Sequence, residues 1–159
     1  MEANLSSSAR KVQDALTALG HSMQVMELPA STRTAVEAAQ AVGCDVGQIV
    51  KSLIFKGRES GRPILILVSG ANRVDLEKAA ATVGEVLDKA DAEFVRQHTG
   101  FAIGGVPPVG HAEALETLID VDLLQYSQVW AAAGTPNAVF CLTPADLERV
   151  TGGRVVKIA

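Results

Sequence analysis

The chain has 159 residues, of which 48% are hydrophobic and 20% charged, so it is long enough to form one domain with a sizeable apolar core. Its formal net charge of −4 argues against a protein that binds nucleic acid through bulk positive charge. No apolar run approaches the roughly 20 residues of a membrane-spanning helix. The first residues lack a basic stretch leading into an apolar one, so we expect a cytoplasmic protein without a secretory signal.

Cysteine and histidine give little indication of redox or metal chemistry. Cys44 and Cys141 are too few for a disulfide framework and are expected to be reduced core thiols. His21, His98 and His111 are isolated, and no Cys or His pair has the spacing of a zinc site. We therefore expect neither a metal nor a cofactor.

The first half of the chain predicts two helices, a short strand and a β-hairpin. In chain order we expect a helix from the serines at 6–8 to Gly20, a strand over 23–28, a helix begun by Ser31 or Thr32 and ended by Gly43, and a hairpin of residues 49–55 and 63–68. The polar, glycine-containing segment KGRESGR would form the turn of that hairpin.

The second half predicts three helices and four short strands. The helices would run from Asp75 to about 83, over 90–98, and from Thr143 with Pro144 in its first turn to Gly152; the strands would cover 117–121, 128–132, 138–142 and 154–158. Strands outnumber helices and do not alternate with them regularly. We therefore predict an α/β (α+β) fold, a single domain over residues 1–159 whose central mixed sheet is curved or barrel-like and surrounded by helices.

Residues 101–111, FAIGGVPPVGH, form an unusual connection with three glycines and two adjacent prolines. The segment cannot be regular helix or strand, because glycine loosens the backbone and proline removes an N–H donor. The N–H groups of Gly104, Gly105 and Val106 would then be available to a ligand. A buried proline-rich turn explains the same pattern, and the sequence leaves both interpretations open.

Lys51 is the unexpected residue of the predicted hairpin. In QIVKSLIF, the alternation of a strand places Lys51 on the face of Ile49 and Leu53, while Val50 and Ile54 make the opposite face apolar as well. A buried ammonium is costly unless it reaches solvent or meets an anion. Lys51 therefore either extends to the sheet edge or presents its charge to a phosphate or a developing oxyanion.

Charge is segregated along the chain. Residues 51–73 hold five basic residues and one acid, whereas residues 75–93 hold six acids and two lysines. One interpretation is a solvated hairpin followed by a solvated helix. The other is a small basic face for a polyanion, to which Lys56, Arg58, Arg62 and Arg73 would contribute.

Three segments resemble the YbaK family, the prolyl-tRNA-synthetase-associated domain: residues 34–55, 99–111 and 132–153. The resemblance runs from about Thr34 to the end of the chain, in the order and spacing of the family. It implies a mixed, barrel-like sheet and a trans-editing activity, which is hydrolysis of the ester between a wrong amino acid and a tRNA. The usual substrate would be tRNA for proline carrying Ala or Cys.

The resemblance also implies roles for individual residues. Lys51 would hold the terminal phosphate or the substrate carbonyl, and the N–H groups of Gly104 and Gly105, in a loop stiffened by Pro107 and Pro108, would bind the scissile carbonyl. Other matching positions are expected to contact the substrate: Thr34, Ser52, Gly110, His111, Gly134, Thr135 and Asn137. Many relatives carry His where Asn137 stands, which leaves the amino-acid specificity open. No side chain is an obvious nucleophile, so water would attack, helped by the tRNA's own ribose hydroxyl or by a substrate thiol.

Two other classes of function remain open at this point. A non-catalytic module could use the same pocket to bind aminoacyl-tRNA or a synthetase, and a hydrolase of unrelated small esters would act without tRNA. For the editing enzyme the expected partner is the acceptor end of aminoacyl-tRNA, delivered by prolyl-tRNA synthetase or an elongation factor. The sequence leaves the oligomeric state open.

Overall fold

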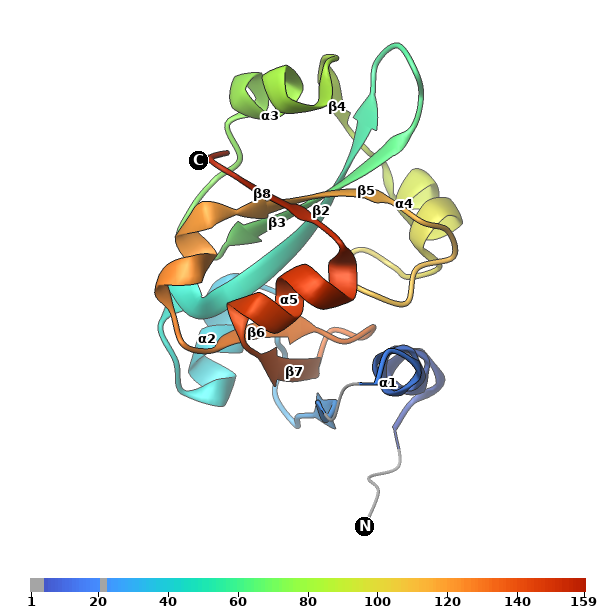
Figure 1. Ribbon diagram of the computed structural model, residues 1–159. Helices are drawn as coiled ribbons and strands as arrows, with labels where there is room; N and C mark the ends of the chain where they lie inside the picture. Colours follow the sequence, from blue (N-terminus) through green and yellow to red (C-terminus); the bar gives the residue numbers. More distant parts are fainter. Residues whose placement is uncertain (1–4, 21–22) are drawn as a thin grey trace.

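The computed structural model describes residues 5–20 and 23–159, so His21 lies outside it. Over the described residues, five α-helices surround an eight-stranded mixed sheet (Figure 1). The predicted α/β fold with a central mixed sheet is confirmed. The path of the sheet ends at β1 and β8, so within these residues the sheet is open rather than a closed barrel.

The elements follow one another with short connections. The helices are α1 (Ser7–Ala18), α2 (Ala35–Val42), α3 (Leu76–Val83), α4 (Ala92–Thr99) and α5 (Pro144–Thr151), with the 3-10 helices η1 (Val46–Gln48) and η2 (Val121–Gln125). The strands are β1 (Met26–Glu27), β2 (Ile49–Gly57), β3 (Pro63–Ser69), β4 (Leu87–Lys89), β5 (Glu116–Asp120), β6 (Val129–Ala132), β7 (Ala138–Leu142) and β8 (Arg154–Val156). Their order in the sheet is β1-β7-β6-β2-β3-β5-β8, and β4 pairs with β2 outside this path.

The predicted hairpin of β2 and β3 forms the centre of the sheet. Its two strands pair antiparallel without interruption from Val50 opposite Ser69 to Lys56 opposite Pro63. The side chains of β3 alternate between two apolar cores: Leu65 and Leu67 belong to one, whereas Ile64, Ile66 and Val68 belong to the other. Both faces of β3 are therefore covered, as its continuous apolar run indicates.

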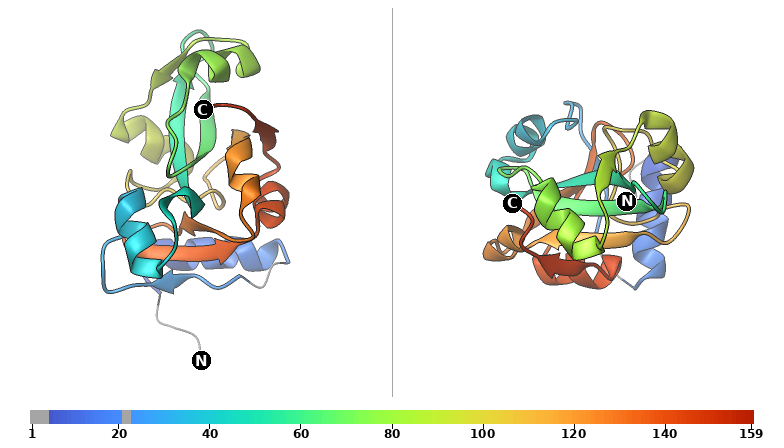
Figure 2. Two further views of the ribbon diagram at one scale, coloured as in Figure 1. Left: turned by 90° about the vertical axis from the view of Figure 1, so that its left-hand side faces the viewer. Right: turned by 90° about the horizontal axis from the view of Figure 1, so that it is seen from above.

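The sheet bends sharply along β2. In the left view of Figure 2, β6 and β7 run across the direction of β2 and β3. As a result β6 pairs with β2 only at Ile49 and Val50, and β4 pairs with it only from Phe55 to Gly57. The middle of β2, at residues 51–54, has no strand beside it on that edge, and its side chains at 51–53 are only partly buried.

Several predicted helix starts are confirmed. Asp75 and Thr143 accept hydrogen bonds from the first turns of α3 and α5, and Ser6 does so for α1. The predicted start of α2 at Ser31 or Thr32 is wrong. Thr34 is the cap, because it forms a reciprocal pair of hydrogen bonds with Glu37, three residues on.

Two strands differ from the prediction. The strand expected over 23–28 is reduced to Met26–Glu27, because only these two residues reach β7. β4 was not predicted, since three residues are too short to show an alternating pattern; its pairing with the end of β2 holds it in place. None of the described helices is long and apolar enough to span a bilayer.

Candidate active site

A cavity of about 600 Å³ lies over the unpaired stretch of β2. Its other walls include helix α2, strand β6 and the loop residues Ile103, Gly104 and Val106, with mostly apolar side chains. The polar residues among its lining are Thr32, Arg33, Thr34, Lys51, Ser52 and Lys89. An apolar cavity with a few polar groups is typical of a binding site for a small molecule or for the end of a larger one.

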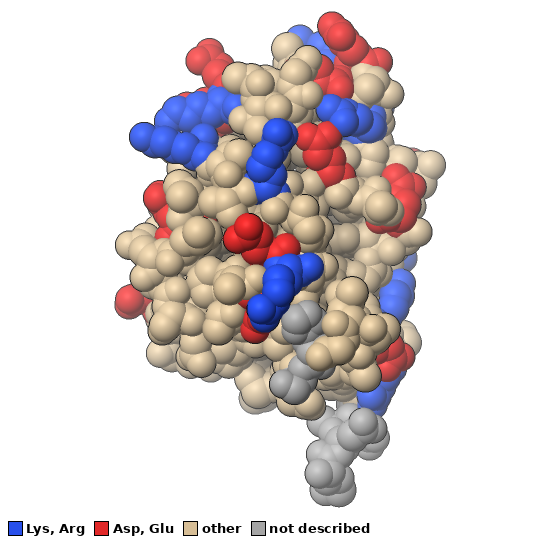
Figure 3. Space-filling view, in the orientation of Figure 1, with Lys and Arg blue, Asp and Glu red and all other residues tan. Residues whose placement is uncertain are grey.

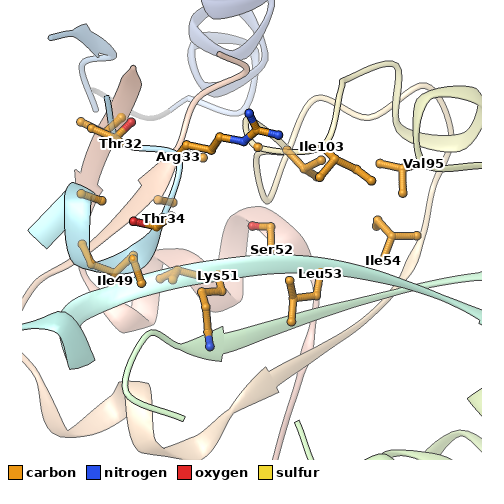
Figure 4. A pocket seen from close by; sticks show the side chains of 18 of the residues that line it. Thr32, Arg33, Thr34, Ile49, Lys51, Ser52, Leu53, Ile54, Val95 and Ile103 are labelled. Carbon is orange, nitrogen blue, oxygen red and sulfur yellow. The ribbon is translucent and has the colours of Figure 1, made fainter. Parts of the chain in front are cut away.

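Arg33 is one of the cations that line the cavity, with Lys51 and Lys89. Its side chain extends across the cavity toward Ile103 in Figure 4, and a Cβ added at Gly104 would lie 3.1 Å from its Nε. No ion pair to its guanidinium is found in the part of the chain that the structure describes. An exposed guanidinium without an acid can bind a phosphate or a carboxylate.

Ser52 directs its hydroxyl into the same space (Figure 4). Its Oγ is the one buried side-chain nitrogen or oxygen atom without a hydrogen-bond partner in residues 5–20 and 23–159. Leaving a buried hydroxyl unpaired costs about 1–3 kcal/mol. A ligand that bonds to this hydroxyl would recover that energy.

Lys51 lies on the opposite side of β2 from Ser52 in Figure 4. Its Nζ donates to the carbonyl oxygen of Asn72 at 2.5 Å. Burial, followed by the charge of Arg73, lowers the pKa of Lys51 from its ordinary value of 10.5, while Asp120 opposes the shift. The ammonium is thus held behind the strand, although Lys51 also contributes to the cavity lining.

A buried carboxylate organises the surroundings of that ammonium. Asp120 is 1% exposed and accepts hydrogen bonds from the backbone N–H of Ser69 and from Nδ2 of Asn72, at 3.0 and 2.9 Å. Nδ2 of Asn72 also donates to Asp122 at 2.8 Å. Two carboxylates therefore fix the residue whose carbonyl holds Lys51.

The glycine- and proline-rich loop contributes to the cavity through Gly104 and not through Gly105. The predicted free N–H of Gly105 is not observed, because it donates to the carbonyl of Ala102 at 3.2 Å. The Gly105 carbonyl in turn accepts from the N–H of Gly134 at 2.8 Å. The turn at Gly134 and the loop at Gly105 are thus joined by their backbones.

The far end of the same loop lines a second cavity of about 410 Å³, which includes Pro108, Gly110 and His111. His111 bonds to the carbonyl of Pro107 through Nε2 at 2.7 Å. Burial lowers the pKa of His111 below its ordinary value, although the bond to Pro107 partly opposes the shift. The predicted substrate contacts of this loop are therefore divided between two cavities.

Thr135 and Asn137 lie outside the lining of both cavities. The Asn137 side chain accepts from the Thr135 hydroxyl at 3.0 Å and donates to the carbonyl of Leu28 at 2.8 Å. In this structure the two residues connect the turn to the segment before α2. Thr34, by contrast, both caps α2 and lines the larger cavity.

Two basic residues of the hairpin are paired with acids of the segment that follows and of β5. Arg58 forms an ion pair with Asp88 at 2.8 Å, and Arg62 pairs with Glu85 and Glu116 at 3.2 and 2.5 Å. Hydrogen bonds, chiefly from Ser60, lower the pKa of Glu85 to about 2.

Two further basic residues were predicted to contact tRNA. The Nζ of Lys56 lies 5.4 Å from the ring centroid of Phe94, and Arg73 is exposed beside Lys51. On the face in Figure 3, Lys and Arg side chains alternate with Asp and Glu, without a large patch of one sign.

The cysteines line neither cavity. Both are free, as predicted, but only partly buried; Cys44 packs against the core cluster of Ala38, Ala39 and Ile49. Burial is the main cause that raises the pKa of each thiol above its ordinary value. The described residues contain no group of three or more His, Cys, Asp or Glu side chains that could hold a metal ion.

Residues 29–150 match the family model described as the aminoacyl-tRNA editing domain. The chain belongs to this family. The editing domain is 32% identical to YwhH of Bacillus subtilis over 148 residues, which cover 93% of this chain and 94% of YwhH. It is 29% identical to EbsC of Enterococcus faecalis, named as a candidate Cys-tRNA(Pro)/Cys-tRNA(Cys) deacylase, over 79% of this chain and 76% of EbsC.

A solved structure is similar over nearly the whole editing domain. It is described as a candidate trans-editing enzyme for prolyl-tRNA synthetase and is 58% identical to this chain. The two superpose with a TM-score of 0.93 and cover 98% of each other.

Three residues of the editing domain's site were missed by the sequence prediction: Arg33, Asn72 and Asp120. A helix begun at Ser31 or Thr32 would have enclosed Arg33 in its first turn, whereas the capping pair Thr34 and Glu37 leaves it on the loop over the cavity. That pair is a signal visible in the sequence. Asn72 and Asp120 are 48 residues apart, and the sequence offers no local sign of their contact.

Proposed function

We propose that this protein hydrolyses the ester between a small wrong amino acid, Ala or Cys, and tRNA for proline, acting in trans on tRNA released by the synthetase. The observation that carries the proposal is the apolar cavity of about 600 Å³ over β2, lined by Arg33 and Ser52. Among the described residues, the guanidinium of Arg33 has no acid partner and the buried hydroxyl of Ser52 has no hydrogen-bond partner. The names given to EbsC and to the similar solved structure support the choice of tRNA for proline.

The chemical need for such an enzyme follows from the limits of a binding pocket. A pocket distinguishes substrates that differ by one methylene by only about 1–3 kcal/mol. Alanine and cysteine are small enough to enter a site built for proline. A second site that hydrolyses the wrong product restores accuracy.

The reaction needs a water molecule and no cofactor. The water oxygen forms a bond to the ester carbonyl carbon, the bond from that carbon to the ribose oxygen breaks, and a water proton passes to the departing ribose oxygen. The vicinal ribose hydroxyl of the terminal adenosine is placed to assist that proton transfer. The protein's contribution is then to orient the ester, to stabilise the developing negative charge and to limit the size of the amino acid.

Arg33 and Lys51 have separate roles in this proposal. Arg33 faces the cavity and has no acid partner among residues 5–20 and 23–159, so we assign it to the terminal phosphate of the acceptor end. Lys51 acts through its charge, either from behind β2 or after its ammonium leaves the Asn72 carbonyl. The hydrogen bond from Lys51 to the Asn72 carbonyl is charge-assisted. To replace it, a substrate group must form a hydrogen bond with the ammonium that is at least as strong.

The test is the loss of ester from tRNA for proline charged separately with Ala, Cys, Ser and Pro. We expect rapid loss of Ala or Cys and persistence of Pro. Binding of these tRNAs without ester loss would contradict hydrolysis and favour a non-catalytic module. Cleavage of a small aminoacyl ester as fast as of charged tRNA would contradict tRNA as the substrate.

A further inference from the structure

The edge of β2 that faces the larger cavity carries backbone groups without a neighbouring strand. On that edge β6 pairs only with Ile49 and Val50, and β4 only with Phe55 to Gly57. Residues 51–54 lie between the two and line the cavity. The gap is therefore bordered by strands at both ends and open in the middle.

The hydrogen bonds at the two ends of the hairpin fix which groups point into the gap. The N–H of Gly70 donates to the carbonyl oxygen of Ile49 at 2.7 Å, and the N–H of Gly57 donates to the carbonyl oxygen of Arg62 at 2.9 Å. The register between these points is unbroken. In an antiparallel pair, alternate residues direct both of their backbone groups to the partner strand.

Residues 49, 51, 53, 55 and 57 therefore bond to β3, and the even-numbered residues point the other way. Val50 meets β6 and Lys56 meets β4. Three backbone groups on this edge of β2 therefore have no partner strand: the N–H and C=O of Ser52 and the N–H of Ile54. The C=O of Ile54 is not counted, because the pairing with β4 begins there. The unpaired Oγ of Ser52 adds a fourth polar group at the same place.

Polar groups without hydrogen-bond partners are energetically unfavourable in the free protein. More than nine in ten buried backbone polar groups are paired in native structures, so a gap of this kind calls for a ligand or for water. A strand edge of this type binds extended chains by adding them as a further strand. Here the gap is the length of one or two residues, because strands close it at both ends.

We propose that Ser52 binds the aminoacyl group of the substrate as a one-residue added strand. The α-ammonium donates to the Ser52 carbonyl, and the ester carbonyl oxygen accepts from the Ser52 N–H. The Ser52 hydroxyl and the Ile54 N–H lie beside the same ester. This inference rests on the proposed function and names its recognition element: the main chain of β2 reads the groups that all α-amino acids share, and the apolar walls select for side-chain size.

The same arrangement supplies the donors for the reaction. Negative charge grows on the ester oxygen as water attacks, so the Ser52 N–H strengthens its bond in the transition state. The donors predicted in the glycine loop are fewer than expected, because the Gly105 N–H is already bonded to Ala102. The β2 edge supplies two further backbone donors, the N–H groups of Ser52 and Ile54.

The first test follows individual amides by NMR and does not depend on hydrolysis. In the free protein, the Ser52 N–H exchanges with solvent faster than those of Lys51 and Leu53, which bond to β3 and serve as matched controls on either side. The probe is 3′-deoxy-3′-(alanylamino)adenosine, an amide in place of the ester. On binding we expect the Ser52 resonance to shift and its exchange to slow at least about tenfold, because a donor in a hydrogen bond is protected.

An analogue in which the alanyl nitrogen is acetylated is the matched ligand, because it removes the ammonium and keeps the carbonyl. We expect it to bind at least about tenfold more weakly, the loss of one charge-assisted bond. The inference is overturned if the Ser52 amide is unaffected while Gly104 shifts, if acetylation leaves the affinity unchanged, or if neither analogue binds at millimolar concentration.

Variants give a second test by single-turnover deacylation of the mischarged tRNA. Ser52→Ala keeps the backbone groups and is expected to lose no more than about tenfold, since it removes one hydroxyl. Ser52→Pro removes an N–H that does not bond to β3, a position where proline is compatible with a strand. It should lose about 10²–10³ in rate, the cost of one oxyanion donor.

Leu53→Pro breaks the pairing with β3, so it serves as the control that shows how far unfolding alone lowers the deacylation rate. A folded Ser52→Pro variant with the rate of Ser52→Ala contradicts the inference. If the wild-type protein leaves every charged tRNA intact, the proposed function fails, and the amide measurement still decides the binding mode.

Discussion

The two cavities of this protein are lined by different parts of one loop and differ in how their polar groups are used. Ile103, Gly104 and Val106 line the cavity of about 600 Å³, and residues 108–115 line the one of about 410 Å³. In the smaller cavity, His111 is bonded to Pro107 and Glu113 is paired with His98. In the larger one, the guanidinium of Arg33 and the hydroxyl of Ser52 have no partner within the described residues.

This difference separates residues that build the loop from residues that face the substrate. A sequence motif does not distinguish residues that build the loop from residues that face the substrate, because both are needed for the same local structure. Only unpaired polar groups beside an apolar space indicate where a ligand binds. On this basis we propose the larger cavity as the substrate site and regard the smaller one as a consequence of how the loop is held.

The largest effect is expected where the wall between the cavities meets the turn at Gly134. A Cβ at Gly105 would lie 2.8 Å from the backbone nitrogen of Thr135 and 2.9 Å from the carbonyl carbon of Gly134. Gly105→Val must therefore displace the wall, and we expect a loss of about 10²–10³ in single-turnover deacylation. Overpacking of this kind also lowers the free energy of unfolding by about 1–3 kcal/mol, which a thermal melt measures.

Gly61→Ala is the matched control at the tip of the hairpin. It has a φ of +73° and nothing within 4 Å of an added Cβ, so it strains the backbone without a clash. We expect a cost of about 1–2 kcal/mol in stability and no change in rate. A fully active Gly105→Val variant would show that the position of the wall is irrelevant to the reaction.

Lys51→Ala is expected to have the next largest effect. Removing the charge should slow deacylation at least about tenfold, the loss of one modest charge-assisted contact, with the fold intact. Lys51→Arg keeps a positive charge and should recover part of the rate. Wild-type deacylation by a folded Lys51→Ala protein would remove this residue from the mechanism.

Arg33 and the arginines of the hairpin are alternative contacts for the tRNA phosphates. Within the part of the chain that the structure describes, Arg33 has no acid partner, whereas Arg58 and Arg62 are bonded to acids. Arg33→Ala should weaken tRNA binding and lower the salt dependence of log K by about one unit, the loss of one phosphate contact.

Arg58→Ala is the comparison for that measurement. We expect a smaller change in the salt dependence, because its charge is already neutralised by Asp88. A larger change for Arg58→Ala, or for reversal of Arg58 and Arg62 to Glu, would assign the acceptor end to the hairpin instead.

The smallest effect is expected for the thiols. The pKa of each is raised mainly by burial, so both are protonated near neutral pH, and neither lines a cavity. The double variant Cys44→Ala with Cys141→Ala should retain its deacylation rate and lose only modest thermal stability. A folded double variant without activity would identify a thiol as a nucleophile.

Much of the fold was predictable because local signals agree with the tertiary structure. The hairpin, the caps at Asp75 and Thr143 and the mixed sheet all follow from patterns within a few residues. The site was less predictable, because it depends on where strands end. Nothing near Ser52 in the sequence shows that β6 and β4 stop on either side of it.

The charge pattern illustrates the same limit. The basic stretch from Lys51 to Arg73 was a candidate tRNA surface, yet the acids that neutralise part of it come from the next segment and from β5. Arg33 lies outside that stretch, and no acid among the described residues pairs with it. Local excess of charge in a sequence therefore does not identify the free charge on the folded surface.

The most direct measurement of the central claim is a crystal structure with 3′-deoxy-3′-(alanylamino)adenosine. We predict that the alanyl group occupies the larger cavity beside Ser52, with the adenosine toward Arg33. Binding in the cavity lined by Pro108, Gly110 and His111, or outside both cavities, would contradict the account.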